Sequence, residues 1–162
     1  MPASFISAAL QFELNNLYAE YASALDERRY ADWVALFAES CSYRLQPREN
    51  YDRQLPLCTL SFESKGMLLD RIYGIENTLF HQPYYQRHII GPMRVRAGDV
   101  SDCWQVQANY SVFRTRRNNL SEVFNVGRYI DEVIREDGEL RFSDKHVVFD
   151  SEMIPNSIIY PI

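Results

Sequence analysis

The 162-residue chain has few of the residues on which small stapled or low-complexity proteins depend, since it holds only 3 cysteines, 6 glycines and 7 prolines. The cysteines, Cys41, Cys58 and Cys103, are an odd set at wide spacings, which indicates reduced thiols of the core rather than a disulfide framework. The low glycine and proline content excludes a collagenous or disordered chain. We therefore expect one domain over residues 1–162, able to bury roughly 70% of its unfolded surface.

Positive charge and long apolar runs are also scarce. The 17 Lys and Arg residues stand against 22 Asp and Glu residues, and the net charge is −5. No basic block is longer than a pair, so the electrostatic footprint of nucleic-acid binding is missing. No run approaches the ~18 apolar residues of a membrane span, and the N-terminus lacks the basic segment and cleavage site of a signal peptide. We expect a cytoplasmic protein with no nucleic-acid and no membrane partner.

The motifs of several common chemistries are missing as well. The chain has no phosphate loop and no GxGxxG, GxSxG or CxxC motif, which leaves nucleotide, dinucleotide, acyl-transfer and dithiol chemistry without a signal. His81, His88 and His146 stand 7 and 58 positions apart, with no Cys or second His at the short spacings of a metal site built on one element. We assign no catalytic, cofactor-binding or metal-binding residue in this chain.

What is present begins with helical periodicity in the first half. Apolar residues recur at steps of three and four, which predicts a helix over residues 10–25 and a shorter one over 30–37, docked beside the first. Ser64 is a suitable N-cap for a third helix, whose apolar face would run from Leu68 to Leu79 and which would end before Pro83.

The second half changes to the two-residue period of strands. Residues 104–112 alternate strictly between apolar and polar. Asp137-Gly138 is a hairpin signal that leads into a strand over 140–149. Between them, a strand over 121–135 should carry a bulge or bend near Gly127. Its apolar face is predicted to hold Phe124, Val126, Ile130 and Ile134.

Other segments give weaker predictions. Strands are expected over 41–45, 57–62 and 87–95, the last interrupted by Gly91-Pro92, and the polar segment 46–54 is expected to be a loop. The tail from Ile154 to Ile162 is too apolar to be exposed, and its two prolines prevent a continuous helix. We expect this tail to be a contact between subunits.

Helices first and long strands last are the order of an α+β protein. We predict one curved antiparallel sheet that wraps around the N-terminal helices as a cone. Such a cone encloses a pocket in which Asp26 and His88 could act as acid and base. A buried ion pair or cap is the competing interpretation, because four arginines are available to pair with Asp26: Arg28, Arg29, Arg71 and Arg87.

Several segments, in their order and spacing, resemble the small (β) subunits of Rieske non-haem iron aromatic-ring-hydroxylating oxygenases. They are YASALDERRYADWVALF at 21–37, CSY at 41–43, MLLDRI at 67–72, YQRHI at 85–89, NYSVFRTR at 109–116 and Asp150. Within that family, four further segments look most like the small subunits of salicylate 5-hydroxylases: YRLQPREN at 43–50, LPLC at 55–58, PYYQRHI at 83–89 and DSEMIPNSIIYPI at 150–162.

The resemblance implies a cystatin-like cone, shared in outline with scytalone dehydratase and ketosteroid isomerase. It implies a hexamer of three large (alpha) and three small subunits, with the small subunits as a trimeric base. The large subunit would carry the Rieske iron-sulfur cluster and the mononuclear iron, supplied with electrons from NAD(P)H through a reductase and a ferredoxin. This chain would be the non-catalytic, structural subunit of a mono- or dioxygenase of aromatic catabolism. The alternative is a stand-alone lyase or isomerase that uses Asp26 and His88, and a ligand-binding module is a third class.

Overall fold

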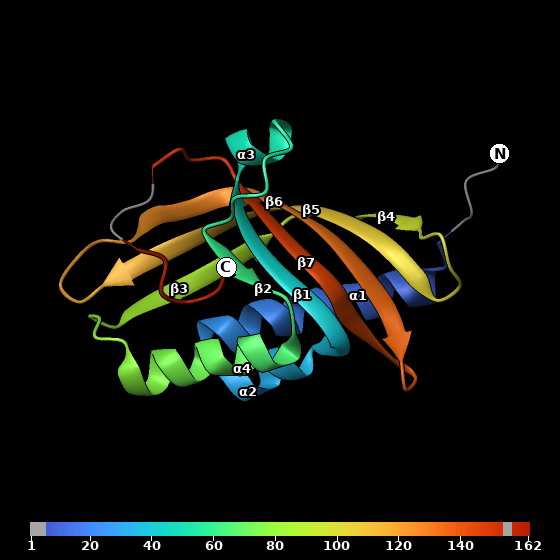
Figure 1. Cartoon of the computed structure of the whole chain (residues 1–162), viewed down its shortest axis with the longest axis horizontal. Coiled ribbons are helices and arrows are strands. Elements are labelled where there is room, and N and C mark those ends of the chain that lie inside the picture. Colours follow the sequence, from blue (N-terminus) through green and yellow to red (C-terminus); the bar gives the residue numbers. More distant parts are fainter. Residues whose placement is uncertain (1–5, 154–156) are drawn as a thin grey trace.

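The computed structural model describes residues 6–153 and 157–162 and shows a strongly curved sheet folded over helices (Figure 1). The sheet order is β2-β1-β7-β6-β5-β3, and β4 also pairs with β5. The helices are α1 (Ala8–Asp26), α2 (Tyr30–Ala35), α3 (Arg48–Asp52), α4 (Lys65–Tyr73) and the π-helix η1 (Gly74–Thr78). The strands are β1 (Phe37–Pro47), β2 (Leu60–Phe62), β3 (Tyr84–Ile90), β4 (Arg94–Ala97), β5 (Cys103–Arg116), β6 (Glu122–Glu136) and β7 (Glu139–Phe149). The α+β curved-sheet prediction is confirmed.

The predicted helices form where their caps and periodicity place them. The Ser7 hydroxyl accepts the N–H of Leu10 at 3.1 Å at the start of α1, and the Ser64 hydroxyl accepts the N–H of Met67 at 3.3 Å at the start of α4. The second helix is shorter than predicted, because the chain turns at Leu36 and β1 begins at Phe37. Both α1 and α2 bury their apolar stripes against the concave side of the sheet (Figure 1).

The sheet differs from the prediction in two ways. Strand β1 pairs parallel to β7, so the sheet is not antiparallel throughout. Residues 48–52, expected to be part of a loop, form α3. The interruption expected at Gly91-Pro92 is confirmed, since it separates β3 from β4. Strand pairing depends on which distant segments meet, and local periodicity carries no information about it.

The predicted apolar face of β6 is wrong along most of the strand. A β-bulge at Phe124 shifts the register, because Val112 pairs with Asn125 while Phe113 pairs with Val123. Beyond the bulge the buried positions are 127, 129, 131 and 133, whereas Val126 is 40% exposed. Gly127, where the bulge was expected, is needed for a close approach instead: a Cβ there would lie 2.0 Å from the main-chain oxygen of Val148 on β7.

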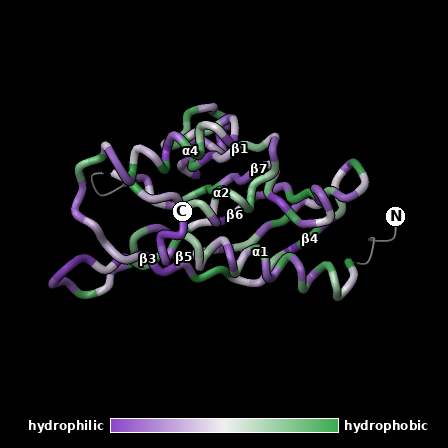
Figure 2. Tube along the Cα trace, turned by 90° about the horizontal axis from the view of Figure 1, so that it is seen from below, coloured by the Kyte–Doolittle hydropathy of each residue, from purple (hydrophilic) through white to green (hydrophobic). Residues whose placement is uncertain are grey.

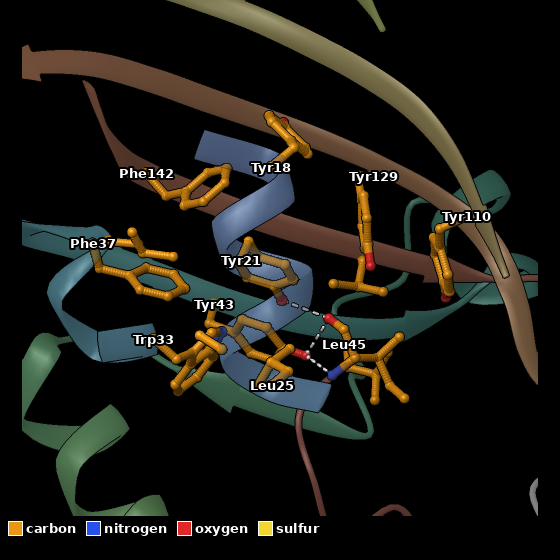
Figure 3. Packing of buried hydrophobic residues seen from close by; sticks show 14 of the residues in the cluster. Tyr18, Tyr21, Leu25, Trp33, Phe37, Tyr43, Leu45, Tyr110, Tyr129 and Phe142 are labelled. Atoms are coloured by element: carbon orange, nitrogen blue, oxygen red, sulfur yellow. Dashed lines mark hydrogen bonds between the residues drawn. The ribbon is translucent and has the colours of Figure 1, made fainter. Parts of the chain in front are cut away.

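An aromatic cluster fills the cone between α1 and the sheet (Figure 3). Tyr21 of α1 lies at its centre, fully buried, with its ring 5.4 Å from that of Phe142 and 6.0 Å from that of Tyr129, both in edge-to-face geometry. Trp33 of α2 packs edge-on against Tyr43 of β1 at 5.8 Å. Aromatic pairs of this geometry add about 0.5–1.5 kcal/mol each beyond area burial, so the interior is held by packed rings.

The expectation that the tail is a subunit contact is wrong for residues 157–162; Ile154 and Pro155 lie outside the described residues. Ile158, Tyr160 and Ile162 are buried against this chain's own core, at 5%, 4% and 0% exposure. The main-chain oxygen of Ile162 accepts the hydroxyls of Tyr21 at 2.6 Å and Tyr43 at 3.2 Å (Figure 3). The segment 157–162 therefore fills the mouth of the cone.

Candidate functional site

The structure brings Asp26 and His88 together. Asp26 is the last residue of α1, and His88 is one of the inward positions of β3, where burial alternates along the strand. The His88 ring Nδ1 lies 2.6 Å from Asp26 Oδ1, and the main-chain N–H of His88 donates to both carboxylate oxygens at 3.0 and 3.2 Å. The Asp26 side chain is 5% exposed and the His88 side chain 0%. The two residues named in the alternative prediction are therefore in direct contact.

Most of the arginines offered as partners of Asp26 have other contacts. Arg87 lies 3.9 Å from Asp26 Oδ2 and is 70% exposed, which makes it a weak partner. Arg28 donates to the main-chain oxygen of Tyr84, and Arg71 donates to the main-chain oxygens of residues 158 and 159 in the tail. Arg29 binds surface carboxylates. His88 is therefore the principal partner of Asp26.

The Asp26–His88 geometry supports two uses. A carboxylate that holds Nδ1 leaves Nε2 free for acid–base work, and His88 Nε2 is buried without a hydrogen-bond partner. The same carboxylate also binds the His88 main-chain N–H, while Arg28 binds the Tyr84 carbonyl, so α1 and the segment after it cover the polar edge of β3. A hollow of about 240 Å³ between α1 and β3 has His88 in its wall, together with Asn15, Tyr18, Ala19, Ala22, Ile90, Gly91 and Met93.

A second polar pair lies deeper, and sequence reasoning missed it. Lys145 of β7 and Asp131 of β6 are both 0% exposed and joined at 2.7 Å. The Tyr18 hydroxyl donates to Asp131 at 2.5 Å, and the Lys145 ammonium lies 3.3 Å from the centroid of the Tyr129 ring. The apolar residues next to them, at positions 130, 147 and 148, suggested that the charged residues face solvent. The available signal was that Asp131 and Lys145, which have opposite charges, lie on the two strands of one predicted hairpin, where they can pair.

Burial dominates the electrostatics of this pair. Desolvation lowers the pKa of Lys145 to about 8, although Asp131 opposes the shift. Desolvation likewise raises the pKa of Asp131, against the opposing effect of Lys145. A buried amine with a lowered pKa is a nucleophile in some enzymes. Here it is enclosed by aromatic rings and bonded to a carboxylate, which is the arrangement of an interior structural pair.

The remaining histidines and the cysteines have structural environments. His146 Nε2 lies 2.8 Å from Gln46 Oε1 on the outer face of the sheet, and burial lowers its pKa to about 4. His81 Nε2 lies 2.8 Å from the Tyr160 hydroxyl. Cys41, Cys58 and Cys103 are free thiols, as expected, with Cys58 half-buried.

Within residues 6–153 and 157–162, no group of three or more His, Cys, Asp or Glu side chains is placed to hold a metal ion. No helix in the described part of the chain is long and apolar enough to cross a membrane.

Comparisons with known proteins agree with one another. The model of a family described as ring hydroxylating beta subunit matches residues 20–156. The chain is 30% identical over 154 residues to the anthranilate 1,2-dioxygenase small subunit of Burkholderia cepacia, covering 93% of each chain. It is 27% identical over 144 residues to the terephthalate 1,2-dioxygenase terminal oxygenase subunit beta 2 of a Comamonas species, covering 89% of this chain and 93% of that one.

Solved structures give the same result. The beta subunit assigned to an aromatic-ring-hydroxylating dioxygenase of Novosphingobium aromaticivorans superposes with a TM-score of 0.85 and 30% identity, covering 95% of this chain and 97% of that one. A Nostoc punctiforme protein with a cystatin-like fold superposes with a TM-score of 0.66 and 17% identity. The match covers 93% of this chain and 97% of that one, and it shows the shared fold alone.

Proposed function

The chain belongs to the family of ring hydroxylating beta subunits, and we propose that it is the non-catalytic, structural small subunit of a multicomponent aromatic-ring hydroxylase. In this family the cofactors sit in the alpha subunit. The proposed partner is accordingly a large subunit with a Rieske cluster and a mononuclear iron, which a ferredoxin and a reductase supply with electrons from NAD(P)H. Because the electrons come from NAD(P)H, we propose that the protein is cytoplasmic. Three small subunits would form the base of a hexamer with three large ones.

One observation carries this proposal: the cone is filled by its own chain. The buried aromatic cluster occupies the interior, and residues 157–162 fill the mouth through bonds to Tyr21 and Tyr43. The buried charges of Lys145 and Asp131 bind each other and have no exposed surface. A substrate that entered the interior of the cone would have to displace packed rings or the tail, so the fold acts as a rigid support.

The substrate class follows from the relatives. Their names give anthranilate and terephthalate, each a single ring that bears a carboxylate. The segments that resemble salicylate 5-hydroxylases favour salicylate, which is also a single aromatic ring that bears a carboxylate. We propose a single-ring aromatic carboxylate as substrate of the assembled enzyme, with salicylate as the first to assay.

Co-expression with a large subunit of a ring-hydroxylating oxygenase tests the proposal. We expect a tag on the small subunit to retain the large one, iron to be found only in the complex, and salicylate turnover to require both chains with reductase and ferredoxin. Stoichiometric iron in the isolated chain, or hydroxylation by it alone, would overturn the proposal. Turnover of another ring carboxylate would refute only the choice of salicylate.

The second candidate function, a lyase or isomerase, is favoured by the unpartnered Nε2 of His88. In that case Asp26→Asn would leave folding and assembly intact and abolish an activity of the isolated chain. We expect the reverse, because Asp26 binds the main chain of β3 as well as the ring.

A further inference from the structure

Exposed apolar side chains form a continuous patch on the outer face of the sheet, opposite the aromatic cluster. Phe113 of β5 is paired with Val123 of β6, and Ser111 connects Ile89 of β3 to Val126 of β6. Together with Tyr85, these side chains are 37–69% exposed. Contiguous apolar surface of this kind marks an interaction site in soluble proteins. We call Tyr85, Ile89, Phe113, Val123 and Val126 the sheet patch.

The sheet patch has an apolar projection and a basic rim. Leu120, in the turn between β5 and β6, is 92% exposed and precedes Val123 of the patch by three residues. Arg116, the last residue of β5, and Arg117 in the turn precede it, and Arg87 on β3 is 70% exposed. The acidic residue nearest to this turn, Glu122 at the start of β6, pairs with Arg114 at 2.7 Å and lies 3.9 Å from Arg116, so one carboxylate faces several guanidinium groups. The rim therefore carries surplus positive charge.

A second apolar surface lies on α4 and η1 and is hollowed rather than projecting. A depression of about 310 Å³ has Phe62, Met67 and Leu79 in its wall, together with Asp70 and with Arg71, whose guanidinium donates to main-chain oxygens of the tail. Leu69, Tyr73 and Phe80 extend the exposed apolar surface around it. Neither Asp70 nor Glu76 of η1 has an ion-pair partner within 4.0 Å among the described residues. We call this depression with Asp70 and Glu76 the helix hollow.

The two surfaces complement each other in shape and charge: one projects an apolar side chain from a basic rim, and the other is an apolar depression beside free carboxylates. In Figure 2, α4 lies along one side of the molecule and β3 and β5 along the other, so one copy cannot join its own two surfaces. Contact between unlike patches of successive copies is heterologous, and such contacts form a closed ring when the rotation between copies closes.

We propose that the sheet patch of one copy docks on the helix hollow of the next, with Leu120 entering the hollow and Arg116 and Arg117 facing Asp70 and Glu76. The occupant of each surface is thus a second copy of this chain. This inference rests on the proposed function, because it names the contact that would build the trimer.

Two single variants and their mixture test the contact by size-exclusion chromatography with light scattering. Val126→Asp removes the sheet patch and Leu79→Asp removes the helix hollow. We expect the wild-type chain to be trimeric at micromolar concentration and each variant to be monomeric with an unchanged far-UV circular dichroism spectrum. An equal mixture should give a one-to-one heterodimer and no trimer, because only one intact interface remains. The control, Val100→Asp, changes an apolar side chain outside both surfaces that is 68% exposed, more than Val126 at 40% and Leu79 at 39%, and it should remain trimeric.

Charge exchange provides a second variant set that does not place an acid on apolar surface. Arg117→Glu should shift the wild-type trimer toward monomer, and adding Asp70→Lys to the same chain should restore it. A monomeric wild type, trimeric Val126→Asp and Leu79→Asp, or a mixture that does not combine would each overturn the proposal. If Val126→Asp stays trimeric but no longer retains the large subunit, the sheet patch binds that subunit instead, and the proposed function stands.

Discussion

Replacing Lys145 with methionine tests whether the buried charge pair stabilises the interior of the sheet. The variant keeps an unbranched apolar side chain but removes the ammonium that lies 2.7 Å from Asp131. Asp131 is then left 0% exposed, with only the Tyr18 hydroxyl and the His146 main-chain N–H as donors. Removing one partner of a buried pair costs about 3–5 kcal/mol, so we expect a loss of that size in the free energy of unfolding.

Such a loss is large, because a domain has only about 5–15 kcal/mol of stability in total. Asp131→Asn should cost a similar amount, since it leaves the ammonium buried among aromatic rings. The double variant Lys145→Met/Asp131→Asn should lose less than the sum of the two by roughly 2–3 kcal/mol, because neither charge is then stranded. Urea unfolding followed by fluorescence of the buried Trp33 measures all four corners of this cycle.

The same pair predicts a pH dependence. Burial lowers the pKa of Lys145 in the folded chain to about 8, below the 10.5 of an exposed lysine. Between these values the unfolded chain binds a proton that the folded chain has released, so the free energy of unfolding gains a contribution that rises with pH across this window. Lys145→Met should lack that contribution. A variant within about 0.5 kcal/mol of wild type, with an unchanged pH profile, would refute the reasoning.

Three further predictions follow from the packing. His88→Ala and Asp26→Asn should each lose about 1.5–3 kcal/mol in urea unfolding, with normal turnover per assembled complex; normal melting with turnover lost would favour acid–base catalysis. Gly127→Ala should cost about 1–3 kcal/mol, because its Cβ would meet the main chain of the next strand, whereas the control Gly66→Ala on α4 has only a side-chain atom at 3.7 Å and should not destabilise; equal melting temperatures would contradict this. Deleting residues 157–162 exposes apolar side chains of the core, whose burial is worth about 1.5–3 kcal/mol each. The melting temperature should therefore fall and the binding of a hydrophobic dye should rise, while trimers stay associated. Dissociation of trimers at an unchanged melting temperature would show that the tail is an interface.

The sequence alone determined the elements whose signals are local. The helical stripe ending near Leu25, the Ser64 cap and the Asp137-Gly138 hairpin each act within a few residues, and each lies where predicted. The resemblance to ring-hydroxylating small subunits also came from the sequence, because family identity is carried by the order of residues. Asp26 and His88 could be paired as candidates, since a helix end and an inward strand position face one another in a cone.

What only the tertiary structure decided depends on contacts between distant residues. The parallel β1–β7 pairing and the bulge at Phe124 set which side of β6 is buried, and they place Asp131 against Lys145 inside the core. The tail gives the clearest case: its apolar residues predict burial equally well against this chain or another. The hydroxyls of Tyr21 and Tyr43, contributed by α1 and β1, bind the main chain of Ile162 and settle it in favour of its own cone. Hydrophobic burial has no direction, whereas hydrogen bonds between specific groups do.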